Sequence, residues 1–337
     1  MCYNFEVQRT PLGVVDTFAK GFTMVNRRLW VVAIIIALDL VLWLGPKVSI
    51  SPLLDDGLNW YHHLLVQSSL QFGPQQALRP DEIEQLYTQT SLALEPLRQV
   101  NLLATLAWNL PCLIKIGASS GLGPLGGKVM ALDMWSWFLM LLVGLGAVGL
   151  LGSCLYLGAL AHLARGESIR GAALVRSLGR NWLRLVLYFI LLGILGLLLV
   201  PPLLLASGTV AGLNPLGAGL VAVIAFIVML CLMFTLFFVD DAIFVSNAGV
   251  LKAIWYSANI VWRNLWSALA FFLVANVILL GMPVAWGLIL GHPVGVVVAI
   301  LGNAYIATGV LTASMLYYWE RFAQWRSPSQ EGRSLAT

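Results

Sequence analysis

Two adjacent carboxylates, Asp240 and Asp241, stand at the end of a long apolar stretch in the segment TLFFVDDAIF. Clustered aspartates such as DDxxD hold magnesium with a diphosphate, but the fifth position is Phe244 here and no second Asp-rich motif follows. A lone pair would bind such a cation weakly. We therefore expect the pair to mark the cytoplasmic border of a membrane helix, facing water beside basic residues such as Lys252 or Arg180, a contact worth about 0–1 kcal/mol.

A third acid, Asp39, lies within the apolar segment AIIIALDLVLWL. Ten residues into a helix, it would be about 15 Å deep in the bilayer, where an acid costs about 2.5–3.5 kcal/mol on insertion scales. Asn276 and Asn303 have similar expected depths in the last two apolar segments. The three side chains are candidates for a polar path, and the alternative is a protonated Asp39 that hydrogen-bonds between helices.

Other residues that could do chemistry lack the required spacing. His62 and His63 are adjacent, whereas zinc-binding pairs on a helix are usually four residues apart. The GxGxxG pattern at Gly144, Gly146 and Gly149 lies within an apolar segment with no strand before it, so it predicts close helix packing. The four cysteines form no metal or disulfide pattern. The sequence predicts no catalytic residues, no metal, no cofactor and no enzyme activity.

These residues belong to a chain of membrane composition. Sixty per cent of the 337 residues are hydrophobic and 10% are charged, against about 25% charged in soluble proteins. A span needs about 20 apolar residues. Five segments meet this condition, and a shorter sixth, Leu29–Leu44, extends through Arg27 and Arg28. The five are Trp135–Leu163, Leu185–Ser207, Leu216–Val239, Leu265–Leu290 and Val296–Trp319.

Charge decides the orientation. A seventh apolar segment, Leu102–Gly117, contains Asn109, Pro111 and Lys115. If it does not span, most of the 19 basic residues lie on one side, as the positive-inside rule requires. We therefore expect six spans, both termini in the cytoplasm and 102–117 as an interfacial or partly inserted helix on the outer side. Residues 45–134 are expected to form a helical outer cap.

The pattern repeats three times. Gly13–Trp30, Gly171–Arg184 and Gly249–Trp266 are short amphipathic segments, each running into a span. Basic residues on such helices favour the lipid-headgroup interface. The residues assigned to this interface are Arg27, Arg28, Arg176, Arg180, Arg184 and Arg263.

The predicted fold is therefore all-α, with six transmembrane helices in three repeats, each an interfacial helix followed by a hairpin. The expected parts are an amino-terminal interfacial segment (1–28), the first hairpin with its cap (29–163), the second repeat (164–239), the third repeat (240–320) and a cytoplasmic tail (321–337).

The segment FFVDDAIFVSNAGVLKAIWYSANIVWRNLWSAL resembles poorly characterised bacterial six-helix membrane proteins related to the membrane domain of glycerophosphoryl diester phosphodiesterases. The shared features are a span ending near an acid, a short helix with an Ala-Ile-x-x-Ser motif (Ala253–Ser257) and a basic turn into the next span. No catalytic residues carry over, since the chemistry of that family resides in a separate soluble domain.

The expected function is that of a non-enzymatic, multi-pass protein of the bacterial plasma membrane. It would serve as an accessory or scaffold component that contacts membrane lipids and other membrane proteins, and nothing in the sequence predicts a nucleic-acid partner. The alternative is a transporter or permease for a small or lipid-like substrate, with Asp39 in its polar path. Proline in the spans, at Pro201, Pro202 and Pro283, would favour this alternative if it broke the helices.

Overall fold

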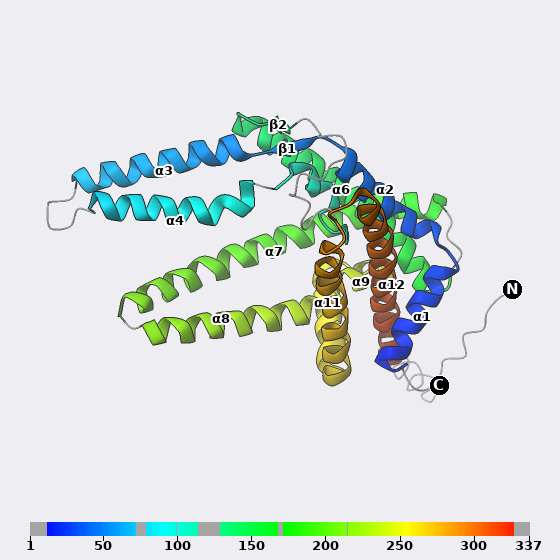
Figure 1. The fold of residues 1–337 in the computed structure, drawn as a ribbon. Coiled ribbons are helices and arrows are strands. Elements are labelled where there is room, and N and C mark those ends of the chain that lie inside the picture. The colour runs from blue at the N-terminus through cyan, green and yellow to red at the C-terminus, as the bar shows by residue number, and fades with distance from the viewer. Residues whose placement is uncertain are drawn as a thin grey trace. The chain divides into compact units, whose positions relative to one another are not determined.

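The computed structural model describes residues 12–71, 79–98, 100–113, 129–167, 171–213 and 215–326. These residues are mainly helical (Figure 1). In chain order the elements are α1 (Val14–Asn26), α2 (Trp30–Leu44), β1 (Lys47–Ser49), α3 (Ser51–Gln71), α4 (Pro80–Arg98), the 3-10 helix η1 (Leu102–Ala107), β2 (Val129–Ala131), α6 (Trp135–Ala164), α7 (Gly171–Leu213), α8 (Pro215–Leu236), α9 (Val239–Val245), α10 (Val250–Arg263), α11 (Leu265–Gly287) and α12 (Pro293–Arg326).

Five helical segments are long and apolar enough to cross a membrane, and each overlaps a predicted span. They are Trp135–Ala164, Val175–Leu203, Gly219–Val245, Leu265–Gly287 and Pro293–Arg326. The all-α class and these five membrane-type helices are thereby confirmed. α2, the sixth predicted span, is an apolar helix of 15 residues, which corresponds to about 22 Å at 1.5 Å per residue.

The chain divides into two compact units. Unit 1 comprises Met1–Ile34, Leu151–Ala285 and Gly302–Thr337, and unit 2 comprises Ile35–Leu150 and Trp286–Leu301. α2, α6, α11 and α12 each contribute to both units.

In unit 1 the carboxyl-terminal part of α12 is surrounded by protein, since residues 312–318 are all buried. α1 packs directly on it (Figure 1). A Cβ on Gly21 would lie 2.8 Å from the backbone nitrogen of Ala313, and a Cβ on Gly309 would overlap the ring of Phe22. The ring of Phe18 stacks on Phe271 of α11 at a centroid distance of 4.7 Å. Glycine at the two positions therefore brings the helices close together.

Unit 2 contains the segment that the sequence predicts as a helical cap. α3 and α4 lie side by side (Figure 1), and their apolar residues at spacings of three and four explain why both are helical. The short parallel ladder of β1 with β2 was not predicted. It pairs Val48 with Met130 and joins the two ends of the cap segment.

One expected boundary is absent. The second repeat was predicted to have an interfacial helix separate from its span, but residues 171–213 form a single helix, α7. α1 ends at Asn26 and α10 at Arg263 before the next helix begins. α7 also continues through Pro201 and Pro202, and α11 through Pro283.

Candidate functional site

The apolar segment that carries the acid pair is broken just before the two acids. α8 ends at Leu236 and α9 begins at Val239. Ser257 of α10 bridges this break: its hydroxyl donates to the carbonyl oxygen of Thr235 at 2.6 Å and accepts from the N–H of Phe238 at 3.2 Å. Backbone groups inside a membrane must be satisfied by the protein itself. The serine of the Ala-Ile-x-x-Ser motif therefore stabilises the break.

Asp241 lies in the interior of unit 1. It is 5% exposed, and its Oδ2 accepts a hydrogen bond from the buried Ser314 hydroxyl of α12 at 2.5 Å. Asp240 is half-buried. The expectation that the pair faces water is thus wrong for Asp241. The reason is that α9 is covered by the protein, and every residue of this helix except Asp240 is buried.

The carboxyl end of α9 is held by a cation from the end of α6. Nη1 of Arg165 donates to the carbonyl oxygens of Val245 at 2.8 Å and Phe244 at 3.4 Å. The same guanidinium contacts Glu167, with an Nε–Oε1 distance of 3.2 Å. A cation at this end of a helix also offsets its negative dipole end.

After α9 the chain turns at Asn247, which has a φ of 52°. Asparagine tolerates this conformation better than most residues.

The ion pair expected for Asp241 with Lys252 or Arg180 is not found among the described residues. The bonds to Asp241 and α9 come instead from Ser314 and Arg165. Sequence reasoning named Ser257 only as part of the Ala-Ile-x-x-Ser motif and did not single out Ser314, because a serine in an apolar helix gives no signal of which partner it meets.

Asp39 is fully buried in unit 2. Its Oδ2 accepts a hydrogen bond from the backbone N–H of Leu113 at 3.2 Å. The Leu113 side chain belongs to a buried apolar cluster with Val296 and Ile300 of α12. The carboxyl group of α2 therefore holds a backbone segment from a distant part of the sequence.

The segment held by Asp39 is largely not helical. The expected helix over 102–117 is present only as η1, and residues 114–117 lie outside the described chain. Asn101 caps η1, its Oδ1 accepting from the N–H groups of Leu103 at 3.1 Å and Val48 at 2.9 Å. Pro111, which lacks an N–H, disfavours a continuing helix.

One glycine of the GxGxxG pattern in α6, Gly149, allows the close helix packing that the sequence predicts. A Cβ on Gly149 would lie 2.7 Å from the carbonyl oxygen of Thr105 and 2.5 Å from that of Leu106. Only glycine allows η1 to approach α6 so closely. Gly144 and Gly146 have no such neighbour among the described residues.

The two asparagines of the candidate polar path belong to unit 1, whereas Asp39 belongs to unit 2. Nδ2 of Asn276 donates to the carbonyl oxygen of Phe272, one turn earlier in α11, at 2.8 Å. Asn303 is buried in α12, with 6% of its surface exposed. The polar path itself stays a prediction.

The residues assigned to the headgroup interface differ in exposure. Arg27, Arg176, Arg180 and Arg263 are exposed, and Arg28 and Arg184 are half-buried. The apolar side of α1 packs on protein, with Thr17, Phe18 and Val25 buried. Lys20 reinforces this contact through an ion pair with Glu320 of α12, at 3.3 Å between Nζ and Oε1.

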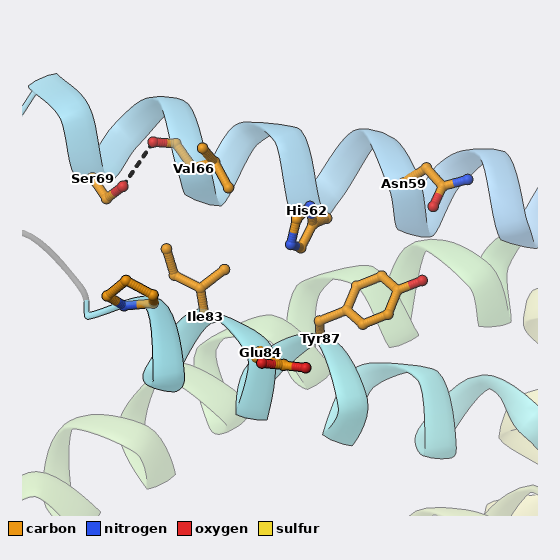
Figure 2. A pocket seen from close by; sticks show the side chains of 8 residues that line it. Asn59, His62, Val66, Ser69, Ile83, Glu84 and Tyr87 are labelled. Carbon is orange, nitrogen blue, oxygen red and sulfur yellow. Dashed lines mark hydrogen bonds between the residues drawn. The ribbon is translucent and has the colours of Figure 1, made fainter.

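A pocket of about 640 Å³ lies between α3 and α4. Figure 2 shows His62 and Val66 on one wall and Ile83, Glu84 and Tyr87 on the other. The rings of His62 and Tyr87 meet edge to face at 5.2 Å between centroids. The pocket contains one imidazole and one carboxylate, which is fewer than the three protein ligands typical of a zinc site.

The amino end of α4 beside this pocket is capped by its own acid. Oε2 of Glu82 accepts a hydrogen bond from the backbone N–H of Arg79 at 3.0 Å. This backbone bond, aided by the Arg79 charge, lowers the pKa of the Glu82 carboxyl below its ordinary value. The carboxylate form is the one that stabilises a helix amino end.

No protein-family model matches the chain, and searches of curated proteins and of solved structures found no similar protein.

Proposed function

We propose that the chain is a non-enzymatic accessory or scaffold component of the bacterial plasma membrane that contacts lipids and partner membrane proteins. In this proposal it crosses the membrane six times, as three repeats, with both termini in the cytoplasm. The resemblance to the six-helix membrane domain family and the positive-inside charge bias support that arrangement.

The observation that carries the proposal is the surface of the hairpin of α7 and α8. In the most apolar 18-residue stretch of Val175–Leu203, only 11% of the residues are buried within the protein. In that of Gly219–Val245, the buried share is 6%. Large apolar side chains are exposed along both helices, including Ile190, Ile194, Leu197, Val223, Phe226, Ile227 and Met233. A helix that is apolar all round suits a fully apolar environment. This hairpin offers lipids and neighbouring helices more surface than the protein itself uses.

The buried acids agree with this proposal. Asp39 bonds to the Leu113 amide and Asp241 to the Ser314 hydroxyl. Both carboxyl groups thus position parts of the chain, a role that needs no substrate.

The test is purification of the full chain from its native membrane in mild detergent after in-cell cross-linking, with mass spectrometry of bound proteins. We expect at least one protein to cross-link to wild type and to be lost from Val223→Trp, which crowds the exposed surface of α8. Val15→Trp, on the exposed side of α1, is the matched control and should retain the partner. Recovery of the same proteins with an unrelated membrane protein would contradict the scaffold proposal.

A second candidate function is transport, and the break between α8 and α9 is the observation that favours it. Broken helices often hold the substrate or coupling ion in transporters, and here Asp240 and Asp241 directly follow the break. Asp241→Asn and Asp39→Asn should then abolish uptake or efflux of a solute while the protein stays folded in membranes. Unchanged transport in both variants would leave the scaffold function.

A further inference from the structure

α10 is a short amphipathic helix with three distinct sides. Leu251, Trp255 and Trp262 fall within about 40° of one another at 100° per residue. They are 76%, 63% and 62% exposed. We call these three residues the tryptophan stripe of α10. Trp266, in the first turn of α11, is 81% exposed as well.

The opposite side of α10 is fixed to the protein. Ala253, Ser257, Ile260 and Val261 are buried and lie about 180–280° from Leu251 in the same projection. Ser257 bonds across the break between α8 and α9. The tryptophan stripe therefore cannot turn inward without the loss of this packing.

A basic edge borders the stripe. Lys252 and Arg263 lie about 100–120° from Leu251, and both are exposed. Neither forms a hydrogen bond or ion pair with another described residue. Their cationic groups are thus available to an anionic ligand.

The end of α12 adds a further cation beside Arg263. The guanidinium of Arg263 lies 5.9 Å from the ring centroid of Trp325, and that of Arg326 lies 4.9 Å from the ring centroid of Phe322. The ring of Tyr256 contacts both aromatic rings, at 5.2 and 5.5 Å. Guanidinium groups form bidentate hydrogen bonds with phosphate oxygens, so cations held beside these rings suit a phosphate ligand.

We propose that this side of α10 is a binding site for anionic phospholipid. The tryptophan stripe lies at the boundary of headgroups and acyl chains, where indole rings are favoured, and Lys252, Arg263 and Arg326 contact lipid phosphates. The proposal rests on the membrane location proposed above, and it adds a lipid class and a site. α1 lacks the stripe, because its exposed residues are Val15, Asp16, Ala19, Thr23 and Asn26.

The experiment measures lipid bound to the purified full chain by native mass spectrometry, with phosphatidylglycerol and phosphatidylcholine of identical acyl chains. We expect wild type to retain phosphatidylglycerol preferentially. Lys252→Gln with Arg263→Gln should reduce that preference about fivefold per cation removed. Arg27→Gln with Arg28→Gln removes the same charge at headgroup-facing residues beside α1, outside the proposed site, and should reduce the preference by less than the α10 pair does. All variants are first checked for wild-type elution and melting temperature.

Three outcomes would overturn the proposal. They are equal retention of both lipids by wild type, an equal loss in the α10 and α1 double variants, and displacement of phosphatidylglycerol by inorganic phosphate, which would indicate a site for free phosphate. A second variant pair, Trp255→Leu with Trp262→Leu, keeps the stripe apolar and should weaken binding of both lipids. No partner protein is present in this assay, so its failure is distinguishable from failure of the scaffold proposal.

Discussion

A carboxyl group among apolar helices needs hydrogen-bond donors from the protein, and the two buried acids obtain them from different sources. Asp39 uses a backbone N–H, that of Leu113, and Asp241 uses a side-chain hydroxyl, that of Ser314. A buried acceptor or donor that loses its partner costs about 1–3 kcal/mol. Each bond therefore gives a testable difference between a substitution that keeps the acceptor and one that removes it.

For Asp39 we expect the acceptor oxygen to matter more than the charge. Asp39→Asn keeps a carbonyl oxygen for the Leu113 amide and should lower the free energy of unfolding by less than about 1 kcal/mol. Asp39→Leu leaves that amide unsatisfied and should cost about 1–3 kcal/mol. Thermal unfolding in detergent measures both, and Asp133→Leu, at an exposed position, is the control. Equal destabilisation by the Asn and Leu variants would indicate a role for the charge itself.

For Asp241 the informative change is on its partner. Ser314→Ala removes the donor at 2.5 Å from Oδ2 and should destabilise unit 1 by about 1–3 kcal/mol. Asp241→Leu in the Ser314→Ala background should recover part of that loss, because replacing both partners of a buried hydrogen bond by apolar groups costs less than leaving one of them unpaired. Unfolding of the double variant tests this recovery. Thr23→Val, which removes a hydroxyl bonded only within its own helix, should have little effect.

At the scale of elements, the amphipathic helices α1 and α10 use their faces differently. α1 lies against α12 through Gly21 and Gly309 and turns small or polar residues outward. α10 buries one side and leaves its tryptophan stripe exposed. Similar sequence patterns therefore give one helix fixed by glycine contacts and another with a free apolar side.

The contact of α1 with α12 should tolerate no added methyl group. Gly21→Ala places a Cβ 2.8 Å from the backbone of Ala313, so α1 must move, at a cost of about 1–3 kcal/mol. Gly179→Ala in α7, where a Cβ meets nothing within 4 Å, should stabilise by up to about 1 kcal/mol. Both values come from unfolding in detergent. A neutral Gly21→Ala would mean that α1 is not seated on α12 in solution.

At the scale of the whole chain, the apolar segments located five membrane-type helices correctly, because length and composition alone determine them. The sequence could not reveal that α9 is buried, since its contacts come from Ser257, Ser314 and Arg165, residues distant from Asp241 in the chain. For the same reason Asp39 could be recognised as a buried acid, whereas its partner at Leu113 could not. Periodicity reports which side of a helix is apolar and leaves open what covers it.

The number of spans depends on α2, whose 15 residues are fewer than the usual 20. We expect α2 to span, with Arg27 and Arg28 reaching the inner headgroups, so that α3 and α10 lie on opposite sides. Asp55→Cys in α3 should then react with a membrane-impermeant maleimide in intact cells, and Lys252→Cys only after permeabilisation. The background variant replaces Cys231, the exposed native cysteine among the described residues, and Cys2, which lies outside them. If Asp55→Cys also required permeabilisation, α2 would not cross the membrane.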